Sequence, residues 1–98
     1  MGGNFEIPAV GLTGAQISDI ISTSIQEVTG SNKPLDPSEQ LSTYNVLNAD
    51  LVTEIRVNIT AKVAQLGFTL DNNALASITT ASTISDLALA ISGATPNA

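Results

Sequence analysis

The chain contains no cysteine and no histidine, and aromatic residues make up only 3% of its 98 residues. The missing residue types exclude disulfides, thiol nucleophiles, imidazole acid–base chemistry and the usual kinds of zinc site. Because aromatic rings are so few, the hydrophobic core has to be built from Ile, Leu, Val and Ala. This composition favours packed helices over a β-sandwich, whose strands usually rely on aromatic and β-branched pairs.

Positive charge is also scarce, since three cations stand against nine acidic residues and the net charge is −6. So few cations cannot neutralise a run of phosphates, and nucleic-acid binding is therefore disfavoured. An acidic surface indicates partners with basic patches. The alternative is that the negative charge only keeps the protein soluble. The cations are Lys33, Arg56 and Lys62.

No apolar run in the chain is long. The longest uninterrupted one, residues 87–91, is far too short to span a bilayer. No Lys or Arg precedes an apolar stretch at the N-terminus, as it would in a secretory signal. We therefore expect a single cytoplasmic domain without a membrane span.

Apolar residues recur every three or four positions in three segments, which predicts an amphipathic helix in each of residues 13–30, 48–66 and 83–93. A capping residue begins each segment and a glycine marks its end. The capping residues are Thr13, Asn48 and Thr83, and the glycines are Gly30, Gly67 and Gly93.

A long connection, residues 31–47, joins the first two helices. Pro34 and Pro37 prevent a continuous helix there, because each biases the preceding residue toward an extended backbone. A short extra helix is expected over residues 74–78. The apolar side chains expected to fix the connection to the core are Leu35, Leu41, Tyr44, Val46 and Leu47.

These elements predict an all-α fold. It is a bundle of three main helices plus a short extra helix, with a long loop between helices one and two. We expect residues 1–12 to form a flexible N-terminal arm, residues 13–92 the helical domain, and residues 93–98 a flexible tail.

Four local motifs stand out: Leu35-Asp36-Pro37 followed by Leu41, Glu54-Ile55, Leu66-Gly67-Phe68-Thr69-Leu70 and Thr83-Ile84-Ser85-Asp86-Leu87. Together they resemble the acyl or peptidyl carrier protein family, and the resemblance covers roughly residues 14–92. Two of them are similar to the family's Phe-Gly-Ile-x-Leu link and to the Thr-Val-x-Asp-Leu opening of its final helix. The resemblance implies a carrier-protein-like bundle of fatty-acid or polyketide biosynthesis that is not itself an enzyme.

In that family a phosphopantetheine arm is attached to a serine at the start of helix two. Counting back from Glu54-Ile55 places Ala49 at the serine position, and aligning on Leu51 places Asp50 there. Neither side chain can accept the arm, so the resemblance implies no cofactor as the sequence stands. Two explanations stay open. Either a native serine has been replaced and phosphopantetheine belonged there, or the chain is a natural relative that lost its arm and acts as a binding or scaffold module.

The resemblance also implies that helix two docks on basic-surfaced biosynthetic enzymes such as a ketosynthase or an acyltransferase. The residues expected to face such a partner are Asn48, Asp50, Glu54 and Arg56. Asp50 and Glu54 lie four residues apart and share a helical face, but no further ligand converges on them, so no metal site is predicted. The alternative is a non-catalytic helical structural or adaptor protein unrelated to acyl transfer. The residues do not fix the oligomeric state.

Overall fold

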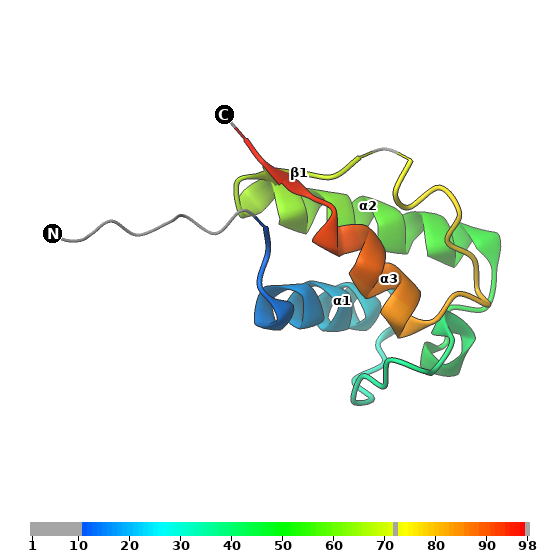
Figure 1. The fold of residues 1–98 in the computed structure, drawn as a ribbon. Helices are drawn as coiled ribbons and strands as arrows, with labels where there is room; N and C mark the ends of the chain where they lie inside the picture. The colour runs from blue at the N-terminus through cyan, green and yellow to red at the C-terminus, as the bar shows by residue number, and fades with distance from the viewer. Residues whose placement is uncertain (1–10, 72, 98) are drawn as a thin grey trace, which may run out of the picture.

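Three α-helices make up most of the structure, a computed structural model that describes residues 11–71 and 73–97. They are α1 (Gly14–Thr29), α2 (Ala49–Gln65) and α3 (Ile84–Ser92), and a 3₁₀-helix, η1 (Leu41–Tyr44), lies between the first two. Figure 1 shows α3 running crosswise to α1 and α2, and α3 packs against α1. The described part of the chain has no helix with both the length and the apolar content needed to cross a membrane.

The predicted helix starts are confirmed in atomic detail. Thr13 Oγ1 accepts a hydrogen bond from the Gln16 amide at 3.1 Å, and the Gln16 side chain accepts one from the Thr13 amide at 2.9 Å. Thr83 and Asp86 form the same reciprocal pair at 3.1 and 3.0 Å. At the end of α1, Gly30 adopts a φ of 78°, a left-handed conformation that glycine takes without steric cost. Local sequence signals therefore set these helix boundaries.

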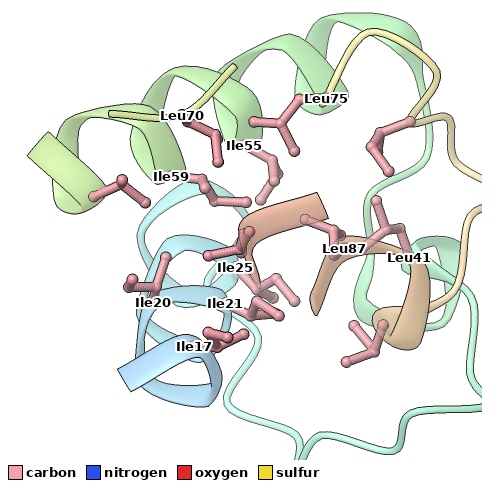
Figure 2. Close-up of a cluster of buried hydrophobic side chains, with 14 of the residues drawn as sticks. Ile17, Ile20, Ile21, Ile25, Leu41, Ile55, Ile59, Leu70, Leu75 and Leu87 are labelled. Atoms are coloured by element: carbon pink, nitrogen blue, oxygen red, sulfur yellow. The ribbon is translucent and has the colours of Figure 1, made fainter. Parts of the chain in front are cut away.

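The core between the helices is almost entirely aliphatic, as the low aromatic content predicts. In Figure 2 the isoleucines of α1 and α2 converge with Leu87 of α3 and Leu41 of η1. Burying each such side chain contributes about 1.5–3 kcal/mol relative to leaving it exposed. The most deeply buried aliphatic residues are Ile21, Ile25, Leu41, Val46, Ile55, Ile59, Val63, Leu87 and Ile91.

Tyr44 fixes the long loop between α1 and α2. It is the largest fully buried side chain, and its hydroxyl donates to the Pro34 carbonyl at 3.1 Å. The same hydroxyl accepts from the Asp36 amide at 2.7 Å. Leu41 and Tyr44 lie three residues apart, so the 3₁₀ conformation directs both side chains to the same side, into the core. A loop with two prolines is thereby given one conformation.

A second set of contacts ties the loop to the segment that precedes α3. Residues 37–42 and 80–85 are joined by four backbone hydrogen bonds of 2.8–3.0 Å. Gln40 and Thr83 stand opposite each other as an antiparallel bridge at the centre of this contact. The same stretch of loop therefore positions both the start of α3 and the segment that leads into α2.

The prediction of an all-α fold is corrected by two short strands. β1 (Phe68–Thr69) pairs antiparallel with β2 (Thr95–Pro96), because Gly67, with a φ of 84°, reverses the chain after α2. The short extra helix expected over residues 74–78 is replaced by turns. The amides of Ala74, Ala76 and Ile78 each donate to the carbonyl three residues earlier, which closes turns rather than an α-helix.

The chain ends differ from the prediction as well. Leu12, assigned to the flexible arm over residues 1–12, is buried in the core, and residues 1–10 of that arm lie outside the described residues. In the predicted tail, residues 93–98, Ala94 is buried and the Asn97 amide donates to the Gly67 carbonyl at 2.9 Å. These contacts hold the described part of the tail, residues 93–97, against the end of α2.

Replacing Tyr44 by phenylalanine should lower the free energy of unfolding by about 1–2 kcal/mol. The ring keeps its place in the core, but the Pro34 carbonyl and the Asp36 amide lose their hydrogen-bond partner. Urea denaturation followed by circular dichroism measures the change. Thr60→Ala is the control, because it removes an exposed hydroxyl that bonds only within α2. Unchanged stability of Tyr44→Phe would contradict the role given to this hydroxyl.

Ser24 is completely buried in α1, and its hydroxyl finds no hydrogen-bond partner among the described residues. Burying an unpartnered hydroxyl is unfavourable, and alanine also has the higher helix propensity. We expect Ser24→Ala to raise the free energy of unfolding by about 1 kcal/mol. Ser22→Ala, at an exposed position of the same helix, isolates the propensity contribution and should give a smaller gain. A loss of stability in Ser24→Ala would show that the hydroxyl is satisfied.

Candidate binding site at the start of α2

The first turn of α2 is fixed by a side-chain cap. Asn48 has an extended backbone, and its side-chain oxygen accepts from the Leu51 amide at 3.0 Å. Val46, two residues before the cap, is completely buried and anchors the chain just ahead of the helix. Ala49 thus becomes the first helical residue and is exposed. The tip of α2, residues 47–50, is therefore capped and exposed.

The residues at this tip do not fit a phosphopantetheine arm, which is attached through a hydroxyl. Ala49 has a methyl group and Asp50 a carboxylate, and both are exposed. The Thr53 hydroxyl, one turn further on, donates to the Ala49 carbonyl at 3.1 Å and accepts from Arg56 at 3.3 Å. In the preceding loop, the Thr43 hydroxyl donates to the Glu39 carboxylate at 3.0 Å. The two nearby threonine hydroxyls are therefore already engaged.

The structure brings together some of the predicted site residues and leaves others apart. Asn48, Ala49 and Arg56 line one hollow of about 230 Å³ between the start of α2 and residues 78–80. Asp50 and Glu54 are exposed on α2 and do not line it. The predicted partner-facing set is therefore divided between a concave, partly apolar site and an acidic outer surface.

Buried aliphatic side chains form the apolar part of the hollow. Val52 and Ile78 are 3% and 7% exposed, so each presents only an edge to the surface. Thr79 and Thr80 add hydroxyl-bearing side chains on the side opposite α2. Sequence reasoning missed residues 78–80 because their threonine-rich stretch has no periodicity that assigns Ile78 to a face.

Leu47 is the clearest correction among the predicted core residues. It was expected to fix the loop to the core, but its side chain is 65% exposed and lies at the edge of the hollow. Its neighbour Val46 is completely buried instead, and Leu47 lies between Val46 and the Asn48 cap of α2. An exposed leucine beside a concave site is available for contact with a bound molecule.

Arg56 differs from the other cations in its surroundings. Lys62 forms an ion pair with Glu27 at 2.9 Å, and the Lys33 ammonium lies 5.8 Å from the centre of the Tyr44 ring. Within residues 11–71 and 73–97, Arg56 has neither a carboxylate at ion-pair distance nor an aromatic ring against it. Its guanidinium donates to the Thr53 hydroxyl, which leaves most of its donors available.

Metal binding finds no support in the arrangement of acidic side chains. In the part of the chain that the structure describes, no group of three or more His, Cys, Asp or Glu residues could hold a metal ion. Asp50 and Glu54 lie four residues apart on α2, and both are exposed.

Comparisons with known proteins do not assign the chain to a family, since no protein-family model, no curated protein and no solved structure matches it. The resemblance to carrier proteins therefore depends on the local motifs alone and stays a prediction.

Replacing Asn48 by alanine should cost about 1 kcal/mol of unfolding free energy, because the Leu51 amide loses its acceptor. Asn48→Asp is the matched variant: it keeps a capping oxygen and adds a negative charge where the helix dipole favours one. We expect its stability to equal or exceed that of the unchanged chain. Hydrogen exchange of the Leu51 amide should speed up only in the alanine variant. Equal exchange in both variants would show that the cap does not hold the tip.

Proposed function

We propose that the chain is a non-catalytic, carrier-protein-like binding module of cytoplasmic fatty-acid or polyketide-type biosynthesis. It presents the tip of α2 to basic-surfaced enzymes such as a ketosynthase or an acyltransferase. The observation that carries this proposal is the exposure of Ala49 at the first position of a capped helix. Ala49 is one of the two positions, with Asp50, to which the resemblance assigns the modified serine.

The charge around the tip supports docking on a basic surface. Asp50 and Glu54 are exposed, and Val57, one turn beyond Glu54, is 63% exposed. Carboxylates around an exposed apolar side chain suit a partner face with cations around an apolar patch. The net charge of −6 adds attraction at a distance, which steers the encounter and weakens as salt is added.

Without a hydroxyl at the tip, the module acts by docking rather than by carrying a covalent cargo. The acidic face can engage a carrier-dependent enzyme, and no thioester is passed on from this chain. Docking on a partner enzyme is thereby separated from the covalent chemistry of a carrier domain, and each can be measured on its own.

Ala49→Ser should convert the tip into an acceptor of phosphopantetheine. The exposed serine would lie at a helix N-terminus, where the backbone amides favour the negative charge of a phosphodiester. Purified protein is incubated with a promiscuous phosphopantetheinyl transferase and coenzyme A, and intact mass is measured. We expect one added phosphopantetheine group in Ala49→Ser and none in the unchanged chain. Ala61→Ser, at an exposed alanine in the C-terminal third of α2, is the matched control and should stay unmodified.

Two results together would contradict the proposal. One is the absence of modification in a folded Ala49→Ser variant. The other is the absence of binding between the unchanged chain and carrier-dependent enzymes at low salt. Both outcomes would favour a helical structural or adaptor protein unrelated to acyl transfer.

A further inference from the structure

The outer face of α3 carries the most exposed of the large apolar side chains that the structure describes. Leu89 is 74% exposed, and it stands at the edge of a second hollow on the surface. We call this the α3 hollow; residues 74–82 line one side of it and residues 86–90 the other. Ile78, which is 7% exposed, presents an edge to it, and Ala74 is half-buried there. A protruding leucine and a recess with apolar walls therefore lie side by side.

Two polar side chains of the α3 hollow are already bonded to the backbone of their own segment. The Ser82 hydroxyl accepts from the Thr79 amide at 2.9 Å, and the Asp86 carboxylate accepts from the Thr83 amide at 3.0 Å. Covering a polar group is costly when it loses every hydrogen-bond partner, and these two groups keep theirs. A molecule that covers the hollow therefore gains apolar contact without having to supply partners for them.

Charge decides what kind of molecule suits this surface. Asp86 is the only charged residue that lines the α3 hollow, and it is the only one in the sequence from residue 73 to residue 97. All other charged residues come earlier, at or before Asp71. Two copies of a chain with a net charge of −6 repel each other, and the repulsion is least where the fewest charges are brought together. A basic partner, by contrast, finds little to attract it here.

The surface is also complementary to itself. In a two-fold dimer both copies present the same patch, so a protruding side chain and the recess that receives it must both belong to that patch. Leu89 and the α3 hollow meet this requirement. A half-turn about an axis that passes between them places the leucine of each copy in the hollow of the other, so the two apolar contacts form together.

We propose that the outer face of α3 is a self-association site, at which two copies of this chain form a two-fold dimer with Leu89 of each in the α3 hollow of the other. The nine residues of α3 span only about 14 Å, so the covered area falls well short of the roughly 800 Å² per partner of a standard interface. The dimer is therefore weak, with a dissociation constant on the order of 0.1–1 mM. It does not rest on the docking proposed for the tip of α2.

Salt separates this association from docking on a basic enzyme. Added salt screens the repulsion between two copies of charge −6, while the burial of Leu89 is unaffected. The dimer should therefore tighten, by roughly threefold between about 0.05 and 0.5 M salt. Attraction between the acidic chain and a basic enzyme weakens over the same range.

Sedimentation equilibrium of the unchanged full chain tests the proposal over about 0.02 to 2 mM protein. The weight-average mass should rise from that of one chain toward that of two, and it should rise more steeply at the higher salt. Amide shifts in ¹H–¹⁵N spectra over the same range should cluster in residues 74–92. In a mixture of ¹³C-labelled and unlabelled chains, isotope-filtered NOEs should connect the methyl groups of Leu89 and Ile78 between copies.

Two pairs of variants separate the site from the general surface. Leu89→Gln removes the protruding side chain but keeps a good helix former, and it should weaken the dimer by about tenfold or more. Leu66→Gln makes the same change at an exposed leucine outside the α3 hollow and should leave the dimer unchanged. Ser77→Glu places a second carboxylate in the hollow and should abolish association. Ser22→Glu adds the same charge at an exposed position of α1 and should have little effect.

A mass equal to that of one chain across the whole range would overturn the proposal and leave the outer face of α3 to a different protein. Association that continues beyond two chains, or that persists unchanged in a folded Leu89→Gln variant, would overturn it as well. The mass of the unchanged chain does not depend on how any variant folds, so this measurement is decisive by itself. Neither result affects the modification of Ala49→Ser, and failure of that modification leaves self-association untouched.

Discussion

The burial of Tyr44 is the constraint on which the rest of the molecule depends. Low aromatic content leaves few large side chains for the core, and this one ends the short 3₁₀-helix η1 in the long connection between α1 and α2 rather than lying in an α-helix. Its ring fills space among aliphatic residues, while its hydroxyl satisfies two backbone groups of the loop. The Thr29 hydroxyl donates to the Tyr44 carbonyl at 3.1 Å, which connects the same residue to the end of α1. One residue therefore links helix end, loop and core.

The geometry of the candidate site follows from that anchored loop. The loop supplies Val46 just ahead of the tip of α2, and its Ser42 amide donates to the Thr80 carbonyl at 3.0 Å. Both sides of the hollow, the start of α2 and residues 78–80, are thus positioned by one segment. The two distant parts of the sequence that form the site are therefore joined by backbone hydrogen bonds of the loop rather than by the side chains of the site itself.

The sequence predicted the parts of this structure that depend on neighbouring residues. The helix starts at Thr13, Asn48 and Thr83 were predictable because a cap involves residues only two or three positions away. The pairing of β1 with β2 was not, because strands of two residues carry no alternating pattern. For the site, the sequence indicated the tip of α2 but not Ile78, since only the folded chain brings it there.

The pairing of β1 with β2 also determines where a fused protein can be attached. Asn97 bonds to Gly67 just beyond α2, and Gly11 lies against the Ser92 carbonyl, so both ends of the described chain gather at one pole (Figure 1). The tip lies at the opposite pole, since α2 has 17 residues and is about 25 Å long. An affinity handle or a neighbouring domain joined at either end would leave the tip unobstructed, so surface immobilisation through the termini keeps it facing the solution.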